Sequence, residues 1–268
     1  MSVVSVVAEP IAGRIRPDLA IVSSLGEHVV GQYVLVRVTD EDGRVGVGEA
    51  SVTSVWSGET QSGAISLVRD VLAPLVVGAD PFDVEWVERR MARAAFGNSF
   101  IRAAVENALL DLQGKILGVP LYRLLGGRGE SARGVRLKFV VGAVPPAEAA
   151  ERALRMVERG WTAIKVKVGR DGDPAADVER LPAVREAVGP EVFLGVDANG
   201  GYTVGQAVWA ARRFEAVGVD LFEQPTRRGD HAAMAEVRRR CGLPIMADES
   251  VFTPQDAWDV LRLGRPTC

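Results

Sequence analysis

Residues 163–169 read AIKVKVG, a short apolar segment that carries two lysines, Lys165 and Lys167. Alternate residues of a β-strand face opposite sides, so both ammonium groups share one side and the apolar residues between them share the other. One explanation is an edge strand whose charged solvent side prevents pairing with other chains. The other is a buried strand with a polar site on one side, and the neighbouring segments must decide between them.

Five apolar segments in the second half of the chain each precede a helical pattern. This alternation predicts a parallel sheet covered by helices, and a repeat of roughly 25 to 30 residues is typical of a (β/α) barrel. A doubly wound sheet is the alternative, but no glycine-rich nucleotide fingerprint follows the first strand. The strands are expected within residues 135–142, 163–169, 192–200, 220–225 and 244–250, and the helices near 146–159, 174–188, 204–217, 230–240 and 254–263.

The first 125 residues follow a different pattern. Residues 1 to about 50 alternate in the manner of antiparallel strands, with a hairpin turn at Asp42-Gly43. Helical spacing follows near 60–76, 82–95 and 99–117. The last of these helices has Asn98 or Ser99 as its N-cap and Gly118 beyond its end.

Together these patterns predict two domains. An α+β domain is expected over residues 1–125. An α/β (β/α)-barrel domain, TIM-like but with about five of the expected strands, is expected over residues 126–268.

The composition excludes several classes of function. The chain has 268 residues, 47% hydrophobic and 25% charged, with a net charge of -3 and no basic run, so nothing favours nucleic acid. No apolar run approaches the roughly 18 residues of a membrane span, and no signal pattern opens the chain, so we expect a cytoplasmic protein. The cysteines (Cys241, Cys268) and the histidines (His28, His231) are too few and too far apart in sequence for a metal cluster. The two cysteines are expected to be free thiols. Any chemistry therefore falls to Lys, Asp and Glu.

Ionisable residues follow four successive predicted strands. The lysine pair ends the second strand, and Asp197, Glu223 and Asp248 end the next three, 26 and 25 residues apart. A carboxylate after a strand often caps the following helix, which is the simpler explanation for any one of them. In a (β/α) barrel, however, the carboxyl ends of the strands form the active site, and one carboxylate per repeat puts all three side by side.

Three neighbouring carboxylates repel one another and would not all stay ionised without a cation. Oxygen ligands without Cys or His suit a hard divalent ion, and three of them favour Mg²⁺ over Ca²⁺, with Mn²⁺ possible. Such a dication and a second ammonium group would both lower the pKa of a lysine, so that Lys165 or Lys167 could act as a base.

The chain resembles the enolase superfamily, in the muconate lactonizing enzyme (muconate cycloisomerase) subgroup of mandelate racemase/muconate lactonizing enzyme-like proteins. Such proteins have an N-terminal capping domain before the barrel and use a lysine or histidine base with Mg²⁺. The resemblance covers nearly the whole chain. Its motifs are GVGEA (46–50), GNSFIRAAVENALLDLQGKILGVPLYRLLGG (97–127), KVK (165–167), VDANGGYT (196–203), FEQP (222–225) and ADES (247–250).

The resemblance implies a role for each site residue. Asp197, Glu223 and Asp248 would be the metal ligands, Lys167 the catalytic acid/base, and Lys165 the residue that tunes Lys167 and holds the enolate oxygen. Asn199 and Glu249 would orient these groups, although each could be only a structural hydrogen-bonding residue.

Two further residues are candidates for substrate specificity. Loops of the N-terminal domain, here about 14–30 and 51–60, would close over the barrel mouth. Trp56 lies in the second loop, but it could equally pack on the domain surface. Lys138 on the first barrel strand could meet a substrate carboxylate, but it could also be a solvated lysine.

The expected activity is removal or addition of a proton α to the carboxylate of a small-molecule substrate, through an enolate, as in muconate cycloisomerase. Alternatives are a racemase or epimerase of amino acid derivatives or dipeptides, an o-succinylbenzoate synthase, or an acid dehydratase. The resemblance also predicts a homo-oligomer and further barrel strands, one with another lysine, which implies a C-terminally truncated chain. A truncated, non-catalytic remnant is therefore the alternative from a different class.

Overall fold

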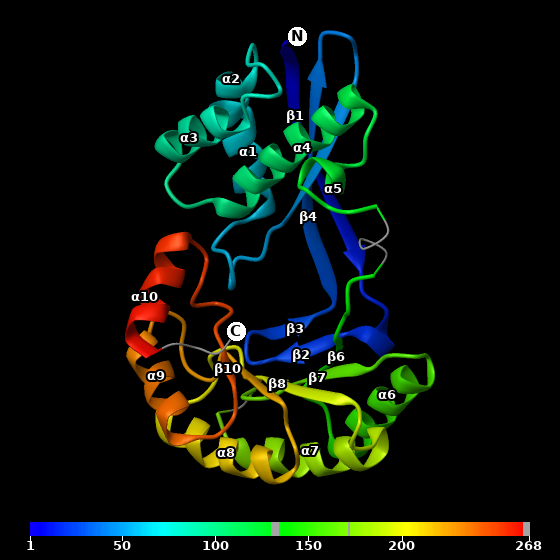
Figure 1. The fold of residues 1–268 in the computed structure, drawn as a ribbon, viewed down its shortest axis with the longest axis vertical. Coiled ribbons are helices and arrows are strands. Elements are labelled where there is room, and N and C mark those ends of the chain that lie inside the picture. The colour runs from blue at the N-terminus through cyan, green and yellow to red at the C-terminus, as the bar shows by residue number, and fades with distance from the viewer. Residues whose placement is uncertain (130–133, 171, 265–268) are drawn as a thin grey trace. The chain divides into compact units, whose positions relative to one another are not determined.

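The computed structural model describes residues 1–129, 134–170 and 172–264, which fold as two compact units (Figure 1). The first unit comprises residues 1–15 and 30–135, and the second comprises residues 16–29 and 136–268. No helix in the described ranges is long and apolar enough to cross a membrane. Cys241 is a free, partly buried thiol, and Cys268 lies outside the described residues.

The first unit is an antiparallel sheet with helices, as the sequence predicts (Figure 1). The strands pair in the order β1-β4-β5, and the turn at Asp42-Gly43 joins β4 to β5. The elements are β1 (Val3–Arg14), β4 (Val30–Asp40), β5 (Val45–Ser51), α1 (Gln61–Leu67), a π-helical turn (Val68–Leu72), α2 (Ala73–Val76), α3 (Val84–Ala94), α4 (Ser99–Leu117) and α5 (Leu121–Leu124).

Helix α4 ends where the sequence predicts, but its start is capped differently. Gly118 adopts the left-handed conformation that terminates the helix, with φ of 68°. Asn98 occupies the N-cap position without a side-chain cap bond. Instead the buried carboxylate of Glu59 accepts hydrogen bonds from the backbone N–H groups of Phe100 (2.9 Å) and Ile101 (3.1 Å). The cap therefore comes from a residue about 40 positions earlier, where no local pattern predicts it.

The second unit is a parallel sheet of five strands in the order β10-β9-β8-β7-β6, with helices α6 to α9 along it (Figure 1). This is the expected arrangement of a partial barrel. Its elements are a 3₁₀ turn (Pro17–Leu19), β2 (Ile21–Ser23), β3 (Gly26–His28), β6 (Phe139–Val141), α6 (Pro146–Glu158), β7 (Ala163–Lys167), α7 (Pro174–Val188), β8 (Phe193–Asp197), α8 (Val204–Ala216), β9 (Leu221–Glu223), α9 (His231–Arg240), β10 (Ile245–Met246) and α10 (Pro254–Gly264).

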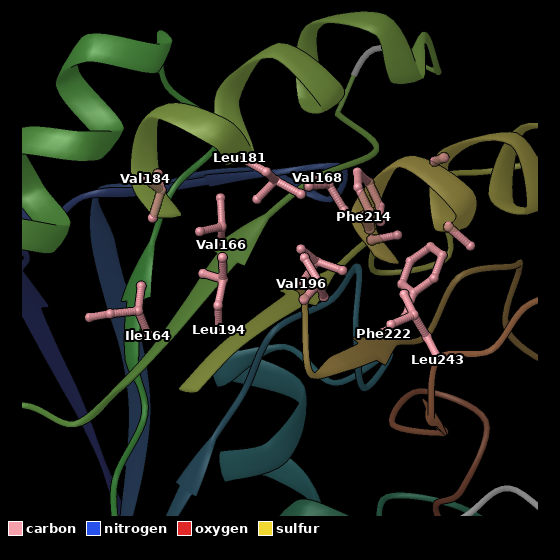
Figure 2. Packing of buried hydrophobic residues seen from close by; sticks show 14 of the residues in the cluster. Ile164, Val166, Val168, Leu181, Val184, Leu194, Val196, Phe214, Phe222 and Leu243 are labelled. Carbon is pink, nitrogen blue, oxygen red and sulfur yellow. The ribbon is translucent and has the colours of Figure 1, made fainter. Parts of the chain in front are cut away.

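Strand β7, which contains the lysine pair, is an interior strand. It pairs with β6 on one side and β8 on the other, so the edge-strand explanation of its charges is wrong. Ile164, Val166 and Val168 are completely buried in the core of the second unit. Figure 2 shows them with Leu181 and Val184 of α7, which the core includes as well. The lysines take the opposite side, as the period of two requires.

The hairpin of β2 and β3 belongs to the second unit, although its sequence lies between strands of the first. The backbone N–H of Ala143 donates to the carbonyl of Val22 (2.8 Å). The hydroxyl of Ser24 donates to the carbonyl of Ala198 (2.9 Å), just after β8. Residues 14–30, expected to be a lid loop of the first domain, thus form a short hairpin at the carboxyl ends of the barrel strands. Because residues 16–29 belong to the second unit, the two units do not correspond to a simple division of the chain after residue 125.

Candidate active site

The register of the parallel strands brings the predicted site residues into one row. Lys167 of β7 lies opposite Asp197 of β8, and Asp197 lies opposite Glu223 of β9. Met246 of β10 pairs with Glu223, and Asp248 follows two residues later. Since all four strands are parallel, these side chains collect at their carboxyl ends, as the spacing of one carboxylate per repeat predicts.

The two lysines contact the two buried carboxylates directly. The Nζ of Lys167 lies 2.6 Å from Oδ2 of Asp197, and the Nζ of Lys165 lies 3.0 Å from the same oxygen. Lys165 also donates to Oε1 of Glu223 at 2.6 Å. The side chains of Asp197 and Glu223 are 0% and 3% exposed. Each buried carboxylate therefore has a lysine in contact where water would otherwise solvate it.

Asn199 links Lys167 to Glu249. Its Oδ1 accepts a hydrogen bond from Lys167 (2.7 Å), and its Nδ2 donates to Oε1 of Glu249 (2.7 Å). A carboxylate only accepts hydrogen bonds, so Glu249 holds the amide with its oxygen toward the ammonium group. Oε2 of Glu249 is buried without a partner among the described residues. Both residues therefore lie in the site, with the contacts of orienting groups.

Asp197, Glu223 and Asp248 do not cap the helices that follow their strands. Thr203 caps α8 in a capping box with Gln206, and Asp230 caps α9. At the start of α10, Asp256 accepts the backbone N–H of Thr253 (2.8 Å). The helix starts are thus served by other residues, and Asp197, Glu223 and Asp248 are left for the site.

Electrostatics in the site follow from burial and close charges. Burial, then repulsion by Asp197, raises the pKa of Glu223, despite the neighbouring Lys165. Burial and repulsion by Glu249 and Asp197 raise the pKa of Asp248. For Asp197, burial acts in the same direction, but attraction by Lys167 and Lys165 outweighs it and the pKa falls. The site thus holds more negative charge than its lysines balance.

The pKa of Lys165 is raised by the contacts that it makes here. The lowering that we expect from a bound dication and a second ammonium group stays a prediction. Burial does act to lower the pKa, but attraction by Asp197 and Glu223 outweighs burial, and the pKa is raised. With these contacts the ammonium group of Lys165 neutralises the carboxylates of Asp197 and Glu223.

Lys138 and Trp56, the specificity candidates, have defined contacts. Strand β6 begins at Phe139, so Lys138 precedes the strand rather than lying on it, and its Nζ is 3.4 Å from Oε2 of Glu223. It therefore faces the site and is not a freely solvated lysine. Trp56 stacks on Phe100 within the first unit, with ring centroids 5.1 Å apart. Its role in specificity stays a prediction.

A buried network behind β7 was missed by sequence reasoning. Asp177 of α7 accepts hydrogen bonds from the N–H of Gly169 (2.8 Å) and the hydroxyl of Tyr202 (2.5 Å). Arg180 donates to Asp177 (2.5 Å) and to the carbonyl of Lys167 (3.3 Å). Burial and the charge of Asp177 raise the pKa of Tyr202, which keeps its hydroxyl protonated. In the sequence of a helix, charged residues look like part of a solvated face, so only the three-dimensional structure reveals that Asp177 and Arg180 are buried.

Comparison with known proteins identifies the family. Residues 6–126 match the model of the mandelate racemase / muconate lactonizing enzyme N-terminal domain, and residues 148–266 match the enolase C-terminal domain-like model. The chain therefore belongs to the mandelate racemase/muconate lactonizing enzyme family of the enolase superfamily.

Its relatives include two kinds of isomerase. The chain is 37% identical over 233 residues to an L-Ala-D/L-Glu epimerase of Bacillus subtilis, covering 86% of this chain and 63% of that protein. It is 36% identical over 233 residues to a chloromuconate cycloisomerase of Cupriavidus pinatubonensis, covering 86% and 62%. The structure of a Cytophaga hutchinsonii dipeptide epimerase complexed with Mg and D-Ala-L-Val aligns with a TM-score of 0.91 at 31% identity, over 98% of this chain and 70% of that one. The chain thus spans somewhat under two thirds of the length of these curated relatives.

Proposed function

We propose that this chain carries the proton-transfer site of a Mg²⁺-dependent enzyme that moves a proton α to a substrate carboxylate, through an enolate. The observation that carries the proposal is the row of Lys167, Asp197 and Glu223 across three strand ends. The side chain of Lys167 is only 12% exposed and bonds to both Asp197 and Asn199, so its amine has a fixed position. A positioned amine of this kind can transfer a proton.

Asp197, Glu223 and Asp248 would hold the metal ion. Three carboxylates at neighbouring strand ends fit the oxygen preference of Mg²⁺ or Mn²⁺, and the excess negative charge favours a cation there. Among the described residues, however, no three such side chains are arranged to hold an ion as they stand. Lys165 bridges Asp197 and Glu223 with its ammonium group, so binding requires that this side chain move aside. Bound Mg²⁺ would neutralise charge that develops on the substrate carboxylate.

Each lysine then has a separate part. Lys167 removes or returns the α-proton, while Asn199 and Asp197 hold its Nζ in place. Lys165, displaced from the carboxylates, supplies a positive charge toward the enolate oxygen. Lys138, 3.4 Å from Glu223, adds a third cation that attracts a carboxylate substrate.

The substrate class we favour is a dipeptide or another N-acylated amino acid. The relatives that support it are epimerases and a racemase of such compounds, at 30 to 37% identity. Cycloisomerisation of a muconate is the second candidate, supported by the chloromuconate cycloisomerase at 36% identity. A homo-oligomer stays a prediction, which sedimentation velocity would test.

Exchange of the substrate α-proton with solvent deuterium tests the proposal, because one base suffices for exchange. The chain would be incubated in D₂O with Mg²⁺ and a panel of dipeptides, N-acyl amino acids and muconolactones, each of which has a removable proton α to a carbonyl or carboxylate, and the α-proton followed by NMR. We expect the exchange to require Mg²⁺. We also expect Lys167→Ala to lower the exchange rate about 10²-fold or more, the usual contribution of a general acid/base.

The matched control is Lys115→Ala, because Lys115 pairs with Asp111 (2.7 Å) in the first unit, outside the site. Its exchange rate should equal that of the unchanged chain. Exchange that survives in Lys167→Ala contradicts the assignment of the base. No exchange with any compound in the panel favours the non-catalytic alternative.

A further inference from the structure

Gln224 is a buried polar residue at the centre of the candidate active site, with no part in the proton transfer. It is 0% exposed and follows Glu223 directly. Its φ of 36° lies in the left-handed region that non-glycine residues seldom adopt. Such strain persists where surrounding interactions hold it, so the contacts of Gln224 indicate its purpose.

The side-chain amide of Gln224 makes four hydrogen bonds, its full capacity. Oε1 accepts from the backbone N–H groups of Asp248 (2.9 Å) and Ser250 (3.3 Å). Nε2 donates to the carbonyl of Thr226 (3.0 Å) and to the hydroxyl of Ser250 (2.8 Å). Three of the four bonds therefore reach the segment 248–250, which contains Asp248.

The backbone of Gln224 joins the neighbouring strands as well. Its N–H donates to the carbonyl of Met246 (2.8 Å), and its carbonyl accepts from Gly200 (2.8 Å), three residues after Asp197. Gln224 is thus bonded to the segments that carry Asp197 and Asp248, and it adjoins Glu223 in sequence. One residue connects all three carboxylate-bearing segments.

The sheet itself does not fix Asp248. Strand β10 consists of two residues, Ile245 and Met246, and its pairing with β9 ends at Met246. Asp248 lies beyond this ladder, and repulsion from Asp197 and Glu249 opposes its approach to the site. Something other than strand pairing must hold it there.

We propose that Gln224 is a positioning residue, which clamps the segment 248–250 to the end of β9 and so holds the Asp248 carboxylate beside those of Asp197 and Glu223. The purpose of this clamp rests on the proposed metal site. The side chain of Gln224 is fully buried and bonded to the chain itself, so we expect its effect to be on metal affinity, through Asp248. Loss of such supporting contacts typically weakens metal binding about 10- to 100-fold.

The test variant is Gln224→Asn. Asparagine tolerates the left-handed conformation but is one methylene shorter, so the backbone strain is relieved while the bonds to segment 248–250 are lost. The matched control is Gln113→Asn, the same change at a buried glutamine of the first unit, which donates to the carbonyl of Pro81 (2.7 Å). Ser250→Ala removes one bond of Gln224 and leaves the bond to the Asp248 N–H.

Amide hydrogen exchange measures the clamp without metal. We expect the amides of Asp248 and Ser250 to exchange about 10-fold faster in Gln224→Asn, the scale of one lost hydrogen bond. The amide of Val168, bonded to the carbonyl of Asp197 (2.9 Å), should be unchanged and reports on the rest of the sheet. Unchanged exchange at Asp248 and Ser250 would overturn the clamp.

Calorimetric titration with Mg²⁺ measures how much the clamp contributes to metal affinity. We expect the Kd to rise about 10- to 100-fold in Gln224→Asn, less in Ser250→Ala, and not at all in Gln113→Asn. A Kd unchanged in Gln224→Asn, with faster amide exchange, would make the clamp purely structural and overturn the positioning role. If the unchanged chain binds no Mg²⁺, the proposed metal site fails, and amide exchange alone decides the clamp.

Discussion

At the scale of single residues, the candidate site is a balance of buried charges. Lys165 and Lys167 share Oδ2 of Asp197, and Glu223 takes a second bond from Lys165. Burying these groups is costly unless each has an opposite charge in contact. Asp197 therefore supports two ammonium groups at once, while Asp248 sits among like charges. The same arrangement that stabilises the lysines leaves the site receptive to another cation.

The buried network of Asp177, Arg180 and Tyr202 is predicted to stabilise the second unit. Tyr202→Phe removes only the hydroxyl that donates to Asp177 (2.5 Å). Because a hydrogen bond to a buried charged group is lost, we expect the free energy of unfolding to fall by about 1.5–3 kcal/mol. Urea unfolding would measure this change.

The control is Tyr122→Phe, since Tyr122 is 38% exposed and the change should be within about 0.5 kcal/mol. Equal stability of Tyr202→Phe and the unchanged chain would mean that the hydroxyl bond contributes nothing.

Sequence reasoning found some of these residues and not others, for a physical reason. The lysine pair and the three carboxylates recur at a fixed place in successive repeats, and topology turns that spacing into proximity. Asp177 and Gln224 have no such periodicity. Gln224 appears in the sequence only as part of the FEQP motif, and its bond to the amide of Asp248, 24 residues away, has no sequence signal.

At the scale of elements, both units bury branched residues between strands and helices, but in the first unit one helix also lies very close to the sheet. In the second unit, branched residues of the strands fill the space against the helices, as Figure 2 shows for Val166, Val196 and Leu181. In the first unit, α4 lies so close to β5 that there is no room for side chains at two positions. A Cβ added to Gly46 would lie 2.0 Å from the carbonyl oxygen of Ala108, and one added to Gly48 would lie 1.9 Å from that of Ala104.

Gly48→Ala is therefore predicted to destabilise the first unit severely. Helix backbone cannot yield as a flexible side chain can, so we expect a loss of at least about 3 kcal/mol, the upper end of overpacking effects. Thermal or urea unfolding followed by circular dichroism would measure it.

Gly13→Ala in β1 is the control, because nothing lies within 4 Å of its added Cβ. This variant should be as stable as the unchanged chain or slightly more so. If Gly48→Ala and Gly13→Ala have the same free energy of unfolding, Gly48 is not required for the close packing of α4 on β5.

Elements were predicted more reliably than the contacts at their ends. Helix α7 lies at 174–188, as its pattern predicts, because spacing of apolar residues sets a helix. The cap of α4 by Glu59 and the hairpin of β2 and β3 were not predicted. Both depend on residues distant in sequence, and the hairpin strands have only three residues each.

At the scale of the whole molecule, each unit has its own hydrophobic core, and all proposed metal and proton-transfer residues come from the second. Alternation of strands and helices from residue 135 onward was enough to predict the parallel α/β unit that carries them. The assignment of residues 16–29 to the second unit was not predictable, because their neighbours in sequence form the strands of the first.

If the three carboxylates hold a metal ion as proposed, metal binding and the stability of the molecule depend on each other. At an Mg²⁺ concentration of 100 times the Kd, binding to the folded state alone adds about 2.7 kcal/mol to the free energy of unfolding. Asp248→Asn should abolish this gain. Without Mg²⁺ the same variant should be as stable as the unchanged chain or more so, because Asn removes the repulsion from Glu249 and Asp197.

Asp197→Asn should differ in kind. It leaves Lys165 and Lys167 without the carboxylate they share, so we expect a loss of about 3–5 kcal/mol even without Mg²⁺. Denaturant unfolding of both variants, with Mg²⁺ and with a chelator, separates the two effects. Since Asp248 is one of the three proposed ligands, an Asp248→Asn variant that retained the full Mg²⁺ stabilisation would place the metal elsewhere.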